Sequence, residues 1–211
     1  EVFELVTASL LNKRENKLHE SIKISLNIEL AKQFVKQLPF KLTDAQRKVV
    51  WQIYQDMESK EPMNRLIEGD VGSGKTVAAT MAALMAMAEN KQVVLMAPTE
   101  ILARQHAETI FKLLTPLNRA DEVVLLIGSL NPSQKRQAHD AIKHGKAKFI
   151  IGTHAVIQDI VDMHNLAMVI IDEQHRFGVE QRKKLMAKAG HMPHLLSLSA
   201  TPIPMSLALT L

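Results

Sequence analysis

The residues with the clearest chemical potential form an eight-residue run, GDVGSGKT, at positions 69–76. It places Gly69, Gly74, Lys75 and Thr76 at the spacing of the Walker A pattern. A backbone that wraps around a phosphate has little room for side chains, so it needs glycines, and free amides at a helix start attract the anion. The lysine adds positive charge at the outer phosphates, and the hydroxyl can bind Mg²⁺. The run therefore predicts a site for ATP and Mg²⁺, with the nucleotide held by Gly69, Gly72, Ser73, Gly74, Lys75 and Thr76.

A pair of acids, Asp172 and Glu173, gives the second chemical signal because it follows the aliphatic run at 168–171. Such a run is typical of a strand buried on both faces, and open parallel sheets bind ligands at the carboxyl ends of their strands. Asp172 can hold Mg²⁺ there, and Glu173 can activate the attacking water as general base. The predicted catalytic residues are thus Lys75, Asp172 and Glu173, and the predicted Mg²⁺ ligands are Thr76 and Asp172. An aliphatic strand ending in Asp-Glu is common, so this assignment depends on the Walker A run upstream.

Alternating strand-like and helix-like segments must position these residues, and they begin at Thr43, a suitable helix cap. Alternation of this kind predicts an α/β fold with a parallel sheet and right-handed crossovers. The expected strands are 65–68, 92–97, 122–127, 148–152, 168–172 and 195–199, and the expected helices are 43–57, 75–89, 100–114, 132–144 and 179–188.

The first 38 residues have a different pattern. Apolar spacing predicts one helix over 2–18 and another over 28–38, which Pro39 would end. The alternating stretch 22–28 between them fits either a short strand or a loop. We therefore expect a helical accessory segment at 1–38 and a nucleotide-binding lobe at 39–211.

Composition narrows the class of protein. With 46% hydrophobic and 23% charged residues, the 211-residue chain is expected to be globular, and its net charge of +4 tolerates a polyanionic partner without identifying one. The absence of cysteine excludes disulfides, thiolate zinc sites and a thiol nucleophile, and fits a cytosolic setting. No signal peptide or membrane span is expected. The chain starts without Met and stops inside an apolar run, so we expect a piece of a longer protein. The nine histidines show no metal-ligand spacing, and His191 and His194 are expected in a loop.

The run DEQH at 172–175, followed by RFGV, resembles the DEQH box, a sequence motif of the RecG family of superfamily 2 DNA helicases. Two near relatives stay as alternatives: the transcription-repair coupling factor, which more often has DEEH, and the replication restart helicase PriA. The Gln at position 174 favours RecG. Five further segments resemble family motifs in the family's order, and together they span about four fifths of the chain: LPFKLTDAQ (38–46), GDVGSGKT (69–76), MAPTEILARQH (96–106), IIGTHAVIQD (150–159) and SATP (199–202).

The resemblance implies a RecA-like P-loop lobe, a parallel sheet flanked by helices with an N-terminal helical segment. It also implies an ATP-dependent motor that moves on double-stranded DNA and remodels branched DNA, such as stalled forks and Holliday junctions, in recombination and repair. A bacterial cytoplasmic, nucleoid-associated monomer is expected. A second RecA-like lobe and a wedge domain would belong to the same longer protein. Because arginine fingers come from the second lobe, this fragment alone should bind ATP weakly and hydrolyse it poorly.

The resemblance also assigns roles to single residues. Gln46 would read adenine through its amide, which can both donate and accept. Gln174 and His175 would sense the nucleotide state, and Ser199 and Thr201 would couple hydrolysis to movement. Phosphates of DNA would be met by helix-start amides and hydroxyls on a face formed by Pro98, Thr99, Arg104, Gly152, Thr153 and His154.

Each of these assignments has a structural alternative. Gln46 could be a first-turn helix residue, and the DNA-facing residues are also ordinary starts of helices and ends of strands. Gln174 with His175 could serve structure alone, and Ser199 with Thr201 could cap a turn. At the level of function, the alternatives are a nucleotide-gated DNA-binding module without turnover and a P-loop kinase for a small acceptor.

Overall fold

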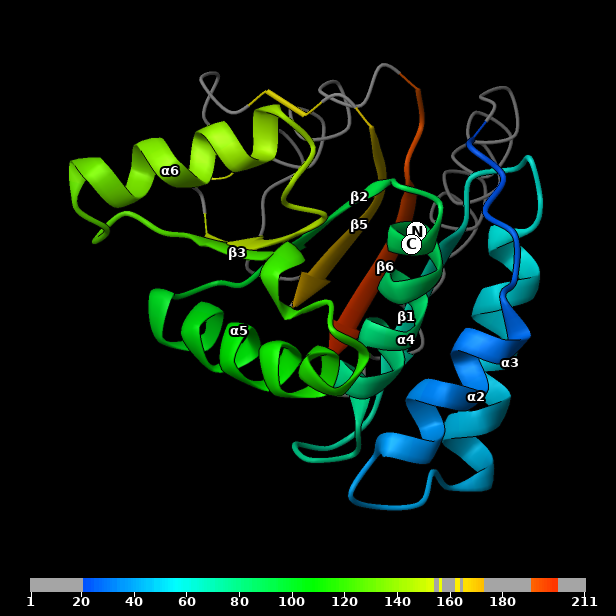
Figure 1. Cartoon of the computed structure of the whole chain (residues 1–211). Coiled ribbons are helices and arrows are strands. Elements are labelled where there is room, and N and C mark those ends of the chain that lie inside the picture. The colour runs from blue at the N-terminus through cyan, green and yellow to red at the C-terminus, as the bar shows by residue number, and fades with distance from the viewer. Residues whose placement is uncertain (1–20, 154–155, 157–161, 164, 173–190, 201–211) are drawn as a thin grey trace, which may run out of the picture.

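The computed structural model describes residues 21–153, 156, 162–163, 165–172 and 191–200, and these build a six-stranded sheet (Figure 1). All strand pairs are parallel, and the order across the sheet is β1-β6-β5-β2-β4-β3. The predicted parallel α/β sheet is therefore confirmed. The strands are β1 (Asn64–Glu68), β2 (Gln92–Met96), β3 (Val123–Leu126), β4 (Phe149–Gly152), β5 (Leu166–Asp172) and β6 (His194–Ser199).

Helices cover both faces of this sheet (Figure 1). Because successive strand residues point to opposite faces, Val93 and Leu95 pack with one set of helices and Val94 with α6 on the other side. Strands β2, β4 and β5 are buried along their whole length, which explains their continuous aliphatic sequences. The helices are α2 (Ile28–Gln37), α3 (Asp44–Met57), α4 (Lys75–Ala88), α5 (Glu100–Leu114) and α6 (Pro132–Lys143), with 3₁₀ turns η1 (Thr115–Leu117) and η2 (Ala120–Glu122).

The observed elements agree with most of the predicted ones to within two residues. Helix α5 has the predicted bounds, and Thr43 caps α3 in a capping box with Gln46. The stretch 22–27 has no regular secondary structure, which is the loop alternative. The predicted helices at 2–18 and 179–188 lie outside the described residues.

One prediction about histidine is wrong. His194 was expected in a loop, but it begins β6 and is fully buried. Its Nδ1 accepts from the amide of Met63 at 3.0 Å, and its Nε2 donates to the carbonyl of Ile22 at 2.8 Å. Residues from before α2 thus cover the start of the strand. A polar first strand residue with two backbone partners gives no apolar signal in the sequence.

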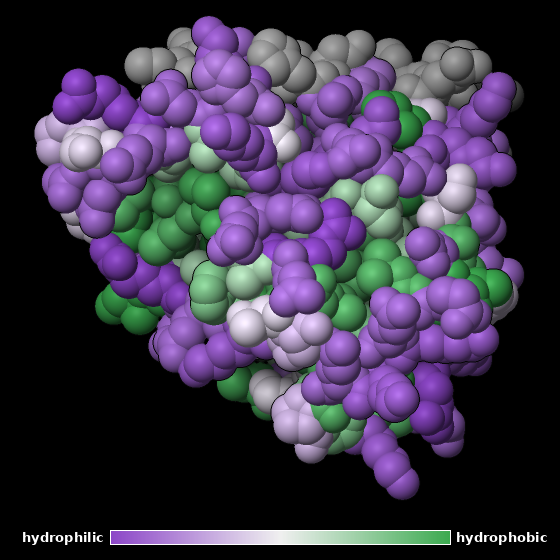
Figure 2. Space-filling view, in the orientation of Figure 1, coloured by the Kyte–Doolittle hydropathy of each residue, from purple (hydrophilic) through white to green (hydrophobic). Residues whose placement is uncertain are grey.

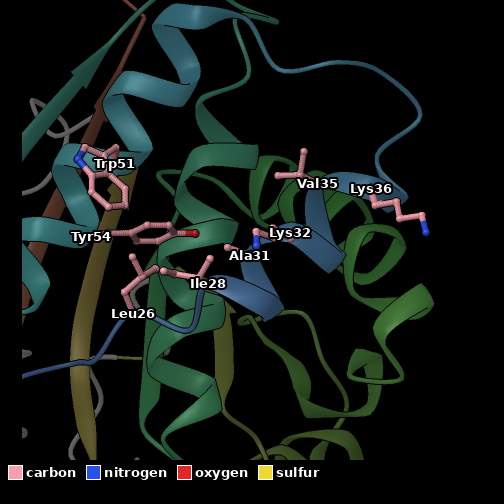
Figure 3. Close-up of a pocket in the computed structure, with 8 residues that line it drawn as sticks. All are labelled: Leu26, Ile28, Ala31, Lys32, Val35, Lys36, Trp51 and Tyr54. Carbon is pink, nitrogen blue, oxygen red and sulfur yellow. The ribbon is translucent and has the colours of Figure 1, made fainter.

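An apolar groove of about 380 Å³ lies between α2 and α3 (Figure 3). It is separate from the carboxyl edge of the sheet, and Trp51, the single tryptophan, is half exposed at its rim. The face shown in Figure 2 is mostly hydrophilic, with separate hydrophobic patches. In the described part of the chain, no helix has the length and apolar character to cross a membrane. The groove is lined by Leu26, Ile28, Ala31, Lys32, Val35, Lys36, Trp51 and Tyr54.

Candidate nucleotide site

The carboxyl ends of β1, β6 and β5 meet at one edge of the sheet, where they bound a cleft of about 440 Å³. Glu68 at the end of β1 pairs with Ser199, and Asp172 at the end of β5 pairs with Leu198. A single strand therefore separates the loop 69–74 from Asp172, and both reach the same cleft. The cleft is lined by Phe40, Val71, Gly72, Gly74, Lys75, Thr76, Val77, Leu102, Gln105, His106, Thr109, Asp172, Leu198 and Ala200.

The loop before α4 has the backbone that the Walker A pattern requires. Gly72 and Gly74 have φ values of 84° and 91°, a left-handed conformation that glycine adopts without steric cost. Gly74 is the N-cap of α4 and has no side chain to cap it, so the amides of the first helical turn face the cleft as anion donors. Lys75 Nζ donates to the carbonyls of Gly69 and of Asp70, the latter at 2.9 Å. The ammonium group is therefore held at the loop that would surround a phosphate.

Gln46 connects this loop to α3. Its Oε1 accepts from the amide of Thr43 at 2.9 Å, and its Nε2 donates to the carbonyl of Ser73 at 2.7 Å. A primary amide has two donor hydrogens and two acceptor lone pairs, so one of each remains for a ligand. The predicted contact with adenine stays a prediction. The structural alternative, a capping role in the first turn of α3, is observed.

His106 joins the two predicted Mg²⁺ ligands. Its Nε2 lies 2.7 Å from Asp172 Oδ2, and its Nδ1 lies 3.5 Å from Thr76 Oγ1. The side chains of His106 and Asp172 are only 13% and 11% exposed, so this contact is screened little by solvent. The imidazole of His106 on α5 thus links α4, through Thr76, to β5, through Asp172.

The hydroxyl of Thr76 and the carboxylate of Asp172 suit Mg²⁺, whose remaining ligands would be phosphate oxygens and water, better than an ion whose ligands all come from the protein. A hydroxyl and a carboxylate are oxygen ligands of the kind Mg²⁺ takes, and both border one cleft. Within the described residues, no group of three or more His, Asp or Glu side chains is arranged to hold an ion. Mg²⁺ typically binds through one or two protein ligands plus substrate phosphates, and that is the arrangement this cleft can provide.

Among the described residues of the predicted DNA face, Pro98, Thr99, Gly152 and Thr153 follow or end β2 and β4 at the same edge of the sheet, and neither they nor Arg104 line the cleft. Thr99 caps α5 by accepting from the amide of Leu102 at 3.3 Å, directly after Pro98 and β2. Gly152 ends the neighbouring strand β4 and its carbonyl accepts from the Ala97 amide.

Two further residues of this predicted face have partners or burial of their own. Thr153, after Gly152, is 8% exposed. The guanidinium of Arg104 donates to Ser129 Oγ at 3.2 Å. The Ser129 hydroxyl also donates to Glu100, which lowers the pKa of that carboxyl below its ordinary value and keeps it anionic beside Arg104.

Ser199 contacts the loop 69–74, which we call the phosphate loop, through its backbone, because its carbonyl accepts from the Gly69 amide at 3.2 Å. The contact fixes the start of the loop against β6. The remaining predicted residues lie outside the described residues: the general base Glu173, the DNA-facing His154, and the coupling residues Gln174, His175 and Thr201.

Four cleft residues with polar or aromatic side chains were not singled out from the sequence. Phe40 is an aromatic side chain, 46% exposed, at the rim of the phosphate loop. Gln105, His106 and Thr109 share one face of α5. Thr109 lies three residues after His106 and four after Gln105, so the three polar side chains are neighbours on the helix surface. This spacing is the signal that could have revealed them.

Comparisons with known proteins identify the family of this chain. The sequence profile described as DEAD/DEAH box helicase matches residues 43–209. The chain belongs to the DEAD/DEAH box helicase family. It is 46% identical to the ATP-dependent DNA helicase RecG of Aquifex aeolicus over 212 residues, which is 100% of this chain and 26% of that protein. Against RecG of Synechocystis the identity is 50% over 87% of this chain and 22% of the relative. The chain thus spans about a quarter of the length of these relatives.

Solved structures give the same answer for the fold. A structure of RecG bound to a three-way DNA junction superposes with a TM-score of 0.85 at 43% identity and covers 99% of this chain and 28% of that one. The DEAD-box helicase Mss116 bound to single-stranded RNA has a TM-score of 0.68 at 19% identity, with 88% of this chain and 40% of that one covered. The second likeness supports the fold alone. The fold is therefore the RecA-like lobe of the helicases, as predicted.

Proposed function

We propose that this chain is the first motor lobe of a RecG-type DNA translocase. In that protein ATP hydrolysis drives movement on double-stranded DNA and remodels branched DNA in recombination and repair. The observation that supports this most is the convergence of Lys75, Thr76 and Asp172 on one cleft beside left-handed glycines. The similarity to RecG, including a structure on a three-way DNA junction, supports the choice of branched DNA.

The residues of the cleft divide the work on ATP. First-turn amides of α4 and the loop 69–74 receive the phosphates, and Lys75 exchanges its two carbonyl partners for phosphate oxygens. Gln46 uses its remaining donor and acceptor on adenine. Phe40 offers an exposed ring on which the base can stack. The site thereby selects a nucleoside triphosphate by both ends.

Hydrolysis requires a cation and a base in addition. Thr76 and Asp172 would hold Mg²⁺, which, when bound, neutralises charge on the phosphate oxygens. Glu173, directly after Asp172 in the sequence, is proposed as the general base that activates water. We propose that this step is coupled to movement by Ser199, whose carbonyl contacts the start of the loop, together with Thr201, Gln174 and His175.

DNA would lie along the row formed by the ends of β2 and β4. We assign phosphate contacts there to the start of α5 and the end of β4, which carry no sequence information, as movement on any DNA requires. We propose a monomer in the bacterial cytoplasm, with residues 1–38 as an accessory helical segment and 39–211 as the lobe. A second RecA-like lobe and a wedge domain would complete it. The DNA-contacting residues are Pro98, Thr99, Arg104, Gly152, Thr153 and His154.

The test compares ATP hydrolysis by the full-length protein with and without forked DNA. We expect strong stimulation by the fork, and loss of turnover in Lys75→Ala. A protein that binds ATP and forked DNA but does not hydrolyse ATP would instead be a nucleotide-gated module, and this would contradict the motor assignment. The 211-residue chain alone should hydrolyse ATP poorly, because arginine fingers of the second lobe are needed to stabilise the transferred phosphoryl group.

A further inference from the structure

We propose that His106 is a positioning residue for the magnesium side of the cleft, where it orients the Thr76 hydroxyl and the Asp172 carboxylate together. The inference rests on the proposed nucleotide function, since it assigns a role to a residue that contacts both proposed Mg²⁺ ligands. It starts from two distances, 2.7 Å from Nε2 to Asp172 Oδ2 and 3.5 Å from Nδ1 to Thr76 Oγ1.

The two contacts determine which ring nitrogen carries the hydrogen in the neutral imidazole. An ionised carboxylate can only accept, so Nε2 must be the donor to Asp172. Nδ1 then has a lone pair that faces the Thr76 hydroxyl 3.5 Å away, so a hydrogen bond that closes between them runs from the hydroxyl to the ring. The order of donation is therefore Thr76 to His106 to Asp172.

This order prepares the hydroxyl for a cation. A hydroxyl oxygen that binds Mg²⁺ must present a lone pair, so its hydrogen has to point elsewhere. Nδ1 of His106 is an acceptor for that hydrogen. At the same time the bond from Nε2 restricts rotation of the Asp172 carboxylate, which is buried at the end of β5.

Supporting residues of this kind are common around metal ligands, and their removal typically lowers metal affinity about 10- to 100-fold. The position of His106 suits the role, because α5 packs beside α4 while its imidazole reaches β5. Within the described residues, no other side chain lies within hydrogen-bonding distance of the side chains of both Thr76 and Asp172.

The experiment measures binding of a fluorescent ATP analogue to the 211-residue chain, once in EDTA and once in a Mg²⁺ titration. His106→Leu should bind the nucleotide like wild type in EDTA but need about 10-fold more Mg²⁺ for half-maximal binding. His106→Gln should stay within about 3-fold of wild type, because its amide both donates and accepts. His139→Leu, the same change at a half-buried histidine of α6, is the matched control and should behave as wild type.

Folding is checked by thermal unfolding of each variant. Should His106→Leu fail to fold, His106→Asn keeps a polar side chain that is too short to bridge both partners, and it should show the same Mg²⁺ shift. An unchanged Mg²⁺ requirement in the folded variant overturns the inference. Equal weakening in EDTA and in Mg²⁺, with no rescue by glutamine, would indicate a purely structural role and also overturn it. Nucleotide binding by wild type that Lys75→Ala leaves intact would overturn the proposed function itself.

Discussion

The side-chain amide of Gln46 donates to the backbone carbonyl of Ser73 at 2.7 Å, and this bond ties the first turn of α3 to the phosphate loop. The same amide also closes the capping box of α3 with Thr43. One residue thus stabilises a helix start and holds the loop in place, and its two roles can be separated by comparison with a residue that only closes a capping box.

Gln46→Ala should lower both stability and nucleotide affinity. The substitution removes the partner of the Thr43 amide, and a lost hydrogen bond costs about 0.5–1.5 kcal/mol, while loss of the bond to Ser73 loosens the loop. Gln134→Ala is the matched control, because Gln134 closes the same kind of capping box with Asn131 at the start of α6. Urea unfolding should show a loss for both variants, at least as large for Gln46→Ala, while titration with a fluorescent nucleotide should show weaker binding only for Gln46→Ala. Equal nucleotide affinities would contradict the role of the Ser73 bond.

Gly74→Ala should be more harmful than the same change at another left-handed glycine. Both Gly74 and Gly145 have positive φ, at 91° and 67°, which costs an alanine about 1–2 kcal/mol. A Cβ at Gly74 would in addition collide with the Gln46 amide, whereas a Cβ at Gly145 meets open space. Chemical denaturation should therefore show a larger loss for Gly74→Ala, with nucleotide binding abolished there and retained in Gly145→Ala. The opposite ranking would refute the packing of Gln46 on the loop.

Lys75→Ala should abolish ATP turnover in the full-length protein and leave the fold intact. The ammonium group bonds only loop carbonyls in the described structure and is not part of the apolar core, so its removal affects charge at the phosphates. Lys143→Ala, an exposed lysine at the end of α6, serves as the control. ATPase assays at saturating forked DNA, together with circular dichroism, check both parts. Retained turnover in a folded Lys75→Ala protein would speak against the Walker A assignment.

His194 should make stability fall as the pH drops below about 6.5, the ordinary pKa of histidine. Burial lowers the pKa of the folded His194, although its bond to the Ile22 carbonyl opposes this shift. Between the lowered pKa and 6.5 the unfolded chain binds a proton that the folded chain does not, so acid favours unfolding. The slope for one proton is up to about 1.4 kcal/mol per pH unit.

Urea midpoints at pH 7.5 and pH 5.5 test this contribution. His194→Gln should be less stable than wild type at pH 7.5 yet lose less on acidification, since its amide does not titrate. His144→Gln, at an exposed histidine after α6, should keep the wild-type pH dependence. If wild type and His194→Gln lose stability equally, another group is responsible.

The sequence predicted the fold well where burial makes the pattern simple. Strand β5 is an aliphatic run because both of its faces are covered, and the capping residue Thr43 marks the start of α3. The loop 69–74 before α4 was equally clear, since its glycines have a fixed spacing and two of them have the positive φ that the pattern requires. His194 was misplaced because its partners, the backbone of Met63 and Ile22, are far from it in sequence.

The support around the site was harder to predict for the same reason. The partners of His106 lie 30 residues before it and 66 after it, and no local period connects them. Phe40 was part of a recognised segment, but its exposure at the cleft rim depends on how α3 packs on the loop. Local patterns predict elements and loops, whereas contacts across the sheet edge need the assembled fold.

Trp51 gives the protein an intrinsic optical reporter. It is the only indole in the chain, and it lies on α3 little more than one helical turn after Gln46, half exposed at the groove in Figure 3. Indole fluorescence moves to shorter wavelength when water leaves the ring. Any shift of α3 that follows a change at the phosphate loop is therefore expected to move the emission maximum of Trp51. Where nucleotide binding shifts α3, the emission of Trp51 would then report occupancy of the cleft in unlabelled protein.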